Sequence, residues 1–349
     1  MPRSSLSVII PNYNDSACIG EAVEAICEQS LPPDEVIVID DGSTDNSVEI
    51  IRKYVSRYPM LRLERNDVNR GVNYTVNRGL KMARSQFFLS CSANDRLLPG
   101  LIEKSMTLLA DYPQAVMCFS NLMMIDKDSG QQFMAENRWL DRPGFVSAED
   151  LAGKLDGGHV YGLSWIARRD LMLEMNGYLP ELKWNSDWFL QHVIGFRYGS
   201  CYLPDPLVVW KNDRAGSYSS GQFNSALHRQ VFVEVLKLLV SPAYKDVIPL
   251  MIRGRALNMF RSAMSVSAVL EAVKYADKLD EPVLKLVRHL AWEMTRNAAN
   301  EYRQSLDKTC TSVRSGTNDA LGVAKNRCDQ VYARAVHEAH RIRQRLRGG

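Results

Sequence analysis

The stretch over residues 7–45 constrains the fold most, because two short β-branched runs flank a segment with helical spacing. The runs are residues 7–10 and 35–39, and runs of this kind favour strands. Between them, apolar residues recur three or four positions apart, at Ile19, Val23 and Ile26. The pattern predicts a helix over residues 19–29 and hence a β-α-β unit with two adjacent parallel strands.

Each predicted strand ends in a polar cluster. The first runs into residues 11–15, Pro-Asn-Tyr-Asn-Asp, and the second into residues 40–43, Asp-Asp-Gly-Ser. A further strand, predicted over residues 86–91, runs into residues 92–95, Ser-Ala-Asn-Asp. In an open α/β sheet, ligands bind at the carboxyl ends of the strands. The sequence therefore predicts one ligand site built from three strand ends.

The residues in these clusters do not suit a dinucleotide held on a glycine loop, because the first turn has no G-x-G-x-x-G. Tyr13 instead offers an aromatic face for stacking on a base, and Asp41 offers a carboxylate for a base N–H or a ribose hydroxyl. Arg70 precedes Gly71 at the predicted start of a helix that lasts to about Ala83, a position that suits a phosphate.

Further elements follow from periodicity and turn residues. Helices are predicted over residues 47–58, 101–110, 145–155, 168–175 and 187–199, strands over 61–64, 115–122 and 202–210, and a turn over 125–130. Beyond residue 220, helical periodicity recurs over residues 222–240, 247–264, 266–279, 283–305 and 318–346. We therefore predict an α/β domain over residues 1–220 and an all-helical region over residues 221–349.

Composition narrows the class of protein. The chain has 349 residues, of which 46% are hydrophobic. Its seven cysteines form no C-x-x-C pair. This pattern favours reduced thiols in the cytoplasm and argues against structural zinc. No window reaches the ~18 apolar residues of a membrane span. The net charge is only +3, and we expect no nucleic-acid partner.

The basic excess lies in the tail, where residues 301–349 hold ten Lys and Arg against five Asp and Glu. The basic run over residues 340–347 has two interpretations. It is a solvated helix face, or it is a basic amphipathic helix that makes peripheral contact with the anionic inner face of a membrane.

Several segments then carry a family likeness in their order and spacing: SVIIPNYN, VIVIDDGSTD, NRGVNYTVNRGLKMA, SANDRLLPG, NSDWFL and PLVVWKNDRAGSYS. Over residues 6–219 the chain resembles the inverting nucleotide-sugar glycosyltransferases of the large second family. The resemblance implies the GT-A fold, a Rossmann-like and mostly parallel open sheet flanked by helices. It also implies a nucleotide-binding half over about residues 1–95 and an acceptor half over about residues 96–220. The activity that it implies is hexosyl transfer from a nucleotide-sugar donor, UDP-linked, to a glycan or lipid-linked acceptor.

The resemblance also implies roles for individual residues. Those expected to bind the nucleotide sugar are Pro11, Asn12, Tyr13, Asp41, Arg70, Ser92 and Ala93. Asp187 lies where the family has its general base, and a carboxylate within reach of the acceptor hydroxyl is what a single in-line displacement requires. The alternative for Asp187 is an ordinary first-turn acid of a helix. Trp184 is a candidate for the acceptor site, whereas we assign Trp188 to the core.

The expected metal site departs from the family. Where such enzymes have an Asp-x-Asp-Asp cluster for Mn²⁺ or Mg²⁺, this chain has Ser92 and Asn94 in place of two carboxylates, so the predicted ligands are Asn94, Asp95 and Asp213. Either Asp213 restores the missing negative charge, or the metal site is inactive. The alternative function is therefore a catalytically weak or inactive nucleotide-sugar-binding module. A sugar nucleotidyltransferase would need a glycine-rich loop after the first strand, and residues 11–16 do not provide one.

Overall fold

The computed structural model describes residues 4–126, 129–155, 165–212, 225–275, 280–294, 296–297 and 337. The chain divides into two compact units, one of residues 1–222 with 253–256 and one of residues 223–252 with 257–349. Asp213, the basic run over residues 340–347 and most of the helix predicted over residues 318–346 lie outside the described residues.

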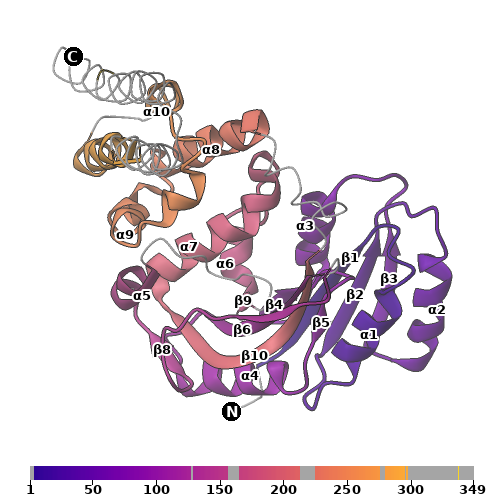
Figure 1. Cartoon of the computed structure of the whole chain (residues 1–349). Helices are drawn as coiled ribbons and strands as arrows, with labels where there is room; N and C mark the ends of the chain where they lie inside the picture. The colour runs from indigo at the N-terminus through magenta and orange to yellow at the C-terminus, as the bar shows by residue number, and fades with distance from the viewer. Residues whose placement is uncertain are drawn as a thin grey trace, which may run out of the picture. The chain divides into compact units, whose positions relative to one another are not determined.

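The first unit is built on one mixed sheet in the order β3-β2-β1-β4-β9-β6-β10-β5, with β7 beside β6 and β8 beside β10 (Figure 1). The strands are β1 (Leu6–Asn12), β2 (Glu35–Asp40), β3 (Leu61–Arg65), β4 (Phe87–Ser90), β5 (Arg96–Leu97), β6 (Met117–Asp126), β7 (Gln132–Ala135), β8 (Gly144–Val146), β9 (Ile166–Arg168) and β10 (Ser200–Asn212). β1 pairs in parallel with both β2 and β4. The predicted convergence of three strand ends on one edge of the sheet is therefore confirmed.

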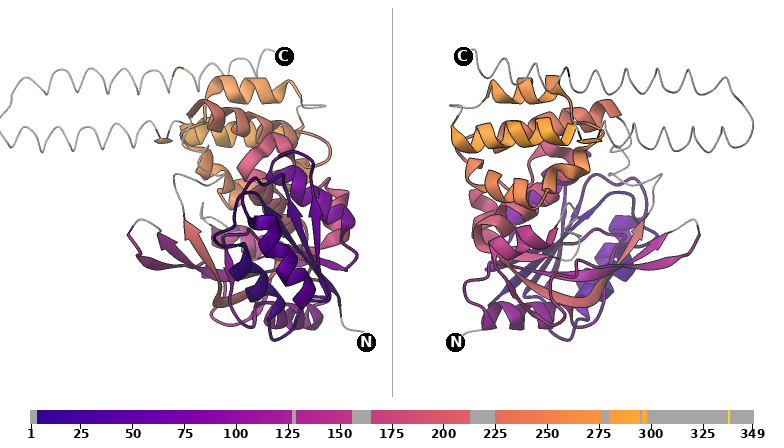
Figure 2. Two further views of the ribbon diagram at one scale, coloured as in Figure 1. Left: turned by 90° about the vertical axis from the view of Figure 1, so that its right-hand side faces the viewer. Right: turned by 60° about the vertical axis from the view of Figure 1, so that its left-hand side comes forward.

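Helices cover this sheet. They are α1 (Ile19–Cys27), α2 (Ser47–Arg57), α3 (Val72–Met82), α4 (Leu101–Asp111), α5 (Ala148–Leu155), α6 (Arg169–Glu174) and α7 (Ser186–Tyr198), with the 3₁₀ helix η2 (Pro180–Asn185) before α7. α1 and α2 lie side by side (Figure 2), joined by ion pairs from Arg57 to Glu24 and Glu28. Because side chains alternate along a strand, Val8 and Ile10 of β1 join the core that contains α1, whereas Ile9 packs against α3.

The structure corrects three predicted elements. Residues 144–146 form β8, so the helix predicted from residue 145 begins only at Ala148. Ser147 caps this helix, because its hydroxyl accepts a hydrogen bond from the Asp150 N–H. β6 continues to Asp126 because β7 pairs with it, which shortens the turn predicted over 125–130. The helix predicted over 247–264 is broken at Arg255, which has a φ of +51°.

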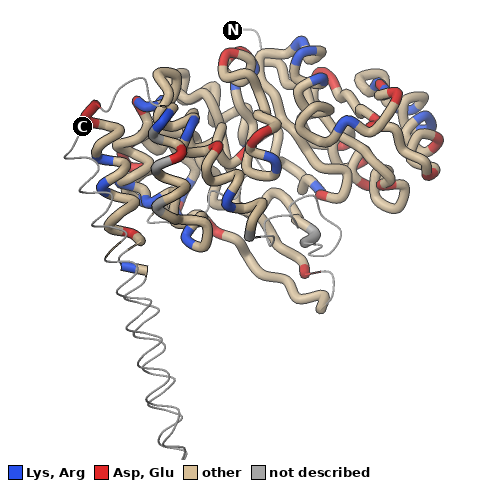
Figure 3. Tube along the Cα trace, turned by 90° about the horizontal axis from the view of Figure 1, so that it is seen from above, with Lys and Arg blue, Asp and Glu red and all other residues tan. Residues whose placement is uncertain are grey.

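The second unit is helical in its described part. Its elements are α8 (Ser225–Leu239), η4 (Lys245–Val247), most of α9 (Ile248–Arg253), η5 (Ala256–Phe260), α10 (Val266–Val273) and a helix over residues 281–294. Figure 3 shows basic and acidic residues scattered over the described part of the chain. Among the described residues, we find no helix whose length and hydropathy would let it span a bilayer.

The closest packing of α3 on the sheet occurs at Gly79, and it yields a prediction. A Cβ at Gly79 would lie 2.5 Å from Ile9 Cγ2 and 3.1 Å from Ile39 Cδ1, and both isoleucines are fully buried in the sheet. We expect Gly79→Ala to lower the free energy of unfolding by about 1–3 kcal/mol in urea titrations, since overpacking strains the contact. Gly20→Ala is the control, because its Cβ would meet only the side chain of Tyr54. Equal stability of the two variants would contradict this account of α3 packing.

Candidate functional site

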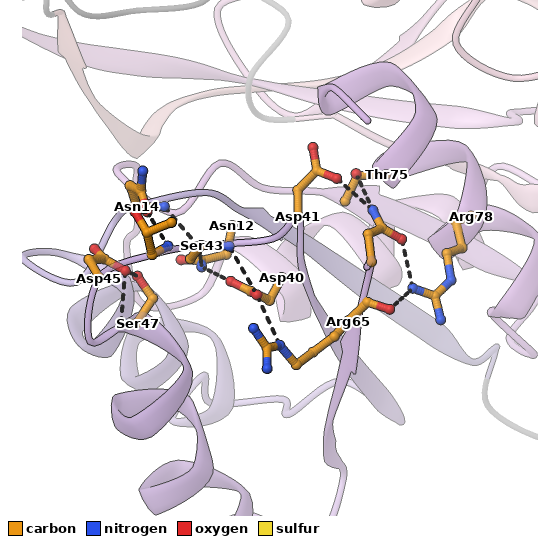
Figure 4. A network of polar contacts seen from close by, with 12 residues as sticks. Asn12, Asn14, Asp40, Asp41, Ser43, Asp45, Ser47, Arg65, Thr75 and Arg78 are labelled. Atoms are coloured by element: carbon orange, nitrogen blue, oxygen red, sulfur yellow. Dashed lines mark hydrogen bonds and ion pairs between the residues drawn. The ribbon is translucent and has the colours of Figure 1, made fainter. Parts of the chain in front are cut away.

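Hydrogen bonds between polar side chains join the loops that follow β1 and β2 (Figure 4). The Asn12 amide donates to Asp40 Oδ1 at 2.9 Å and to Ser43 Oγ at 3.1 Å. Asn14 joins the same two loops through two further hydrogen bonds. Its backbone N–H donates to Ser43 Oγ, and its side-chain Oδ1 accepts from the Thr44 N–H. Asn12 is buried in this network, which favours a role in holding the loop around Tyr13 over direct contact with a ligand.

The carboxylates of Asp40 and Asp45 stabilise the same loops. Asp40 is fully buried and accepts hydrogen bonds from the Ser43 N–H and from Arg65 Nε at 3.2 Å. Partial burial would raise the pKa of Asp45, but hydrogen bonds from Ser47 and Ser16 lower that pKa to about 2. Asp45 therefore stays charged at neutral pH and fixes the start of both α1 and α2.

Asp41 ties the end of β2 to the start of α3. Its Oδ1 accepts hydrogen bonds from the Asn66 amide at 2.7 Å and from the Arg70 N–H at 2.9 Å, and its Oδ2 accepts one from the Gly71 N–H at 2.8 Å. Gly71 has a φ of +87°, a conformation that favours glycine. The Asn66 side-chain amide also donates to Thr75 Oγ1, and its carbonyl oxygen accepts from Arg78. Both the donor and the acceptor of this buried side chain therefore have hydrogen-bond partners.

Two residues predicted to contact a nucleotide remain accessible at this edge. The side chain of Tyr13 is 46% exposed, which leaves its ring free for stacking. Arg70 is exposed, and its guanidinium lies 5.5 Å from the centre of the Tyr74 ring. Pro11 is the second-to-last residue of strand β1, immediately before Asn12.

The cluster after β4 folds into a tight turn, in which the Asp95 N–H donates to the Ser92 carbonyl at 3.1 Å. Ala93 and Asp95 are buried, whereas Ser92 and Asn94 are partly exposed. Burial raises the pKa of Cys91 well above its usual value, and the nearby charge of Asp95 adds to the effect. In the part of the chain that the structure describes, no three His, Cys, Asp or Glu residues lie close enough to hold a metal ion.

Asp187, in the first turn of α7, interacts electrostatically with Tyr178. Burial raises the pKa of Tyr178, and the charge of Asp187 raises it further, while hydrogen bonds with Trp165 and Ser90 oppose the change. Ser90 is the last residue of β4. Asp187 therefore lies near the sheet edge that carries Ser92–Asp95. Burial raises the pKa of Asp187 itself to about 6, although hydrogen bonds from its own N–H and the Trp188 N–H lower it.

The turn before Asp187 is strained and is held from α3. Lys183 has φ 49° and ψ −123°, a conformation that costs a non-glycine residue about 1–3 kcal/mol. Its carbonyl accepts a hydrogen bond from the Asn73 amide at 2.9 Å. One turn later on α3, Asn77 exchanges two hydrogen bonds with the backbone of Tyr178, each of 2.7 Å. Sequence reasoning missed Asn73, Asn77 and Tyr178, because their partners lie about a hundred residues away.

The two tryptophans beside Asp187 differ in burial, and the assignment of Trp188 to the core agrees with the structure. Trp188 is buried, with its ring 4.5 Å from that of His192, which also packs in the interior. Trp184 is partly exposed, and its Nε1 is buried without a hydrogen-bond partner in the structure. Trp184 thus remains a candidate for contact with an acceptor.

The three hydrogen bonds to Asp41 yield a stability prediction. Asp41→Asn leaves one acceptor oxygen and turns an amide N–H₂ toward N–H donors, so it should lower the free energy of unfolding by about 1–3 kcal/mol in chemical denaturation. Asp67→Asn is the control, because Asp67 is exposed in the same loop and its replacement should change stability by less than about 0.5 kcal/mol. Similar stability of the two variants would show that the Asp41 contacts do not hold the loop.

Comparisons with known proteins agree with the sequence motifs. The model of Glycosyl transferase family 2 matches residues 7–173. The uncharacterized glycosyltransferase YibD of Escherichia coli (strain K12) is 38% identical over 105 residues, which cover 30% of this chain and 30% of that protein. The chain spans between 30% and 61% of the length of the first curated relatives that it matches.

Solved structures share the fold. TarS 1–349 of S. aureus in complex with UDP-GlcNAc has a TM-score of 0.57 at 18% identity, over 84% of this chain and 83% of that chain. The mannosyltransferase PcManGT from Pyrobaculum calidifontis, in complex with GDP-Man and Mn²⁺, has a TM-score of 0.54 at 18% identity, over 83% and 85%. The α/β architecture is therefore GT-A-like, as predicted. Over residues 7–173, the chain therefore matches glycosyl transferase family 2.

Proposed function

We propose that this chain is an inverting glycosyltransferase that moves a sugar from a UDP-linked donor to a glycan or lipid-linked acceptor. The observation that carries the proposal is the convergence of the ends of β1, β2 and β4 on one edge of the sheet, where Tyr13 is exposed. Asp187, whose pKa is raised by burial to about 6, supports it. Perturbed carboxyl groups of this kind are frequent among general bases. The match of residues 7–173 to glycosyl transferase family 2 supports the same reaction class.

The single acceptor position left on Asp41 favours a uracil base. A carboxylate oxygen accepts about two hydrogen bonds. Oδ1 already accepts two, from Asn66 and the Arg70 N–H, and Oδ2 accepts one, from the Gly71 N–H. One position is left on Oδ2, which suits the single ring N–H of uracil better than the two adjacent donors of guanine. Tyr13 would stack on the base.

The donor diphosphate would lie near Arg70, whose exposed guanidinium is close to the N-terminus of α3. A cation and a helix N-terminus both stabilise the negative charge that grows on the departing diphosphate. Ser92 and Ala93 follow β4 on the same edge, where the backbone would contact the sugar nucleotide.

Asp187 would act as general base. As the acceptor oxygen forms its bond to the anomeric carbon, its proton passes to the Asp187 carboxylate, and the bond from that carbon to the diphosphate breaks on the opposite face. UDP leaves with the bonding electrons, and the configuration at the anomeric carbon inverts. Trp184, three residues before the base, is the side chain that we assign to the acceptor sugar.

The predicted divalent-metal site is poor in ligands. The described residues offer one amide, Asn94, and one carboxylate, Asp95, whereas Mg²⁺ and Mn²⁺ prefer several charged oxygens. PcManGT binds Mn²⁺ together with GDP-Man. We infer that these two residues do not make a metal site by themselves, and that an ion would be held largely by the donor diphosphate, with Asp213 as a further ligand.

Removal of the base yields a kinetic prediction. Asp187→Asn should reduce kcat for transfer by about 10²–10⁴-fold, the usual contribution of a general base. Binding of UDP, measured by calorimetry, should be unchanged. Stability at pH 7 should not fall, because a carboxyl group whose pKa is raised on folding opposes folding once it ionises. Below about pH 6, the wild-type kcat should fall tenfold per pH unit as Asp187 becomes protonated.

Glu181→Gln is the matched control for this experiment, because Glu181 is an exposed acid in the same η2–α7 segment. Its kcat and pH profile should match those of the wild type. Turnover by Asp187→Asn within a factor of three of the wild type would remove Asp187 from the reaction.

The second candidate function is a nucleotide-sugar-binding module without catalysis, favoured by Ser92 and Asn94 in place of carboxylates. Calorimetry with UDP, in EDTA and then in MnCl₂, distinguishes the two. For the transferase we expect Mn²⁺ to raise UDP affinity by less than about tenfold, because the protein supplies few ligands, and we expect UDP release from a donor panel. Tight UDP binding without any release of UDP from the donors would favour the binding module.

A further inference from the structure

The side chain of Asn73 connects α3 to the turn that precedes Asp187. Asn73 lies in the first turn of α3 and is only 7% exposed. Its amide donates to the Lys183 carbonyl at 2.9 Å and to Ser186 Oγ at 3.1 Å, and it lies 3.5 Å from the Leu179 carbonyl. The Ser186 hydroxyl in turn donates to the Leu179 carbonyl. One asparagine therefore holds both ends of η2 and the residue next to Asp187.

The backbone that Asn73 holds is not one that the chain would adopt by itself. Lys183 occupies a region of φ and ψ that non-glycine residues rarely populate, and its carbonyl is the nearest acceptor of the Asn73 amide. Strained backbone persists only where surrounding contacts determine it, and such positions concentrate at functional sites. Without the amide, the turn over residues 183–186 is free to relax, and the start of α7 can move with it.

Asn73 also stands two residues after the loop that Asp41 holds. The N–H groups of Arg70 and Gly71 donate to the Asp41 carboxylate, and α3 begins at Val72. The segment over residues 70–73 therefore makes both contacts. Its backbone binds Asp41, the proposed nucleoside contact, and its Asn73 side chain binds the turn before Asp187.

We propose that Asn73 is a positioning residue for Asp187, which it keeps in place by fixing the strained turn over residues 183–186. The proposal rests on the proposed function, in which Asp187 is the general base. Asn73 itself contacts neither donor nor acceptor, and its effect on transfer passes through the position and the solvation of the Asp187 carboxylate.

The first test measures Asp187 without any turnover. In protein labelled with ¹³Cγ-aspartate, the Asp187 resonance is assigned by its loss in Asp187→Asn, and its titration midpoint is then followed in variants. The wild type should titrate near pH 6. In Asn73→Ala we expect a midpoint at least one pH unit lower, because a relaxed turn admits water to the carboxylate. Tyr178 interacts electrostatically with Asp187, and its raised pKa keeps it neutral throughout this titration.

Asn121→Ala is the matched control. Asn121 is also a buried asparagine of the first unit with three hydrogen bonds, to Pro204, Asn137 and Tyr202, none of them in the 177–187 segment. Its loss should lower stability comparably and leave the Asp187 midpoint unchanged. An unchanged midpoint in Asn73→Ala, or the same shift in Asn121→Ala, would overturn the proposal. Asn73→Ser decides the matter if Asn73→Ala does not fold.

The second test follows UDP release from UDP-GlcNAc, with water as the acceptor. Asn73→Ala should lower kcat at least tenfold, change the KM for UDP-GlcNAc less than twofold and move the acidic limb of the pH profile to lower pH. A rise in KM that matches the loss of kcat/KM would assign Asn73 to donor binding and refute a positioning role. If the wild type releases no UDP from UDP-GlcNAc or from any other UDP-sugar of the donor panel, the proposed function fails, and the NMR titration still decides whether Asn73 positions Asp187.

Discussion

The hydrogen bonds that Asp41 accepts from the backbone of Arg70 and Gly71 are the interaction on which the rest of the site depends. A parallel sheet brings strand ends to one edge, but it does not position the loops beyond them. Charge-assisted bonds to a buried carboxylate are among the stronger contacts available for that purpose. Here they fix the residues that start α3, and the glycine at position 71 gives the backbone the positive φ that this approach requires.

From that starting point, α3 acts as a rigid support between two parts of the site. One face meets the sheet so closely at Gly79 that a single methyl group would collide with Ile9. Asn73 and Asn77 reach from the same helix to residues 178–186, more than a hundred positions later in the sequence. The nucleoside side and the Asp187 side of the proposed site therefore share one support, and a disturbance of α3 would affect both.

The sequence predicts α4 and the elements from β1 to β4 within a few residues, because apolar runs and helical periodicity are local signals. It does not predict β5, β7 and β8, which have two to four residues each and exist because β6 or β10 lies beside them. The same division holds in the site. Asp41 and Asp187 are recognisable from motif and position, whereas the part played by Asn73 depends on a strained carbonyl 110 residues away, which no local pattern encodes.

The most direct measurement of the central claim is a crystal structure of the protein with UDP-GlcNAc bound. The account predicts that the uracil N–H donates to the free position on Asp41 Oδ2, that the Tyr13 ring stacks on the base, and that Asp187 is the carboxylate nearest to the anomeric carbon. A nucleotide bound away from Asp41, or an anomeric carbon that faces another acid while Asp187 stays remote, would contradict it.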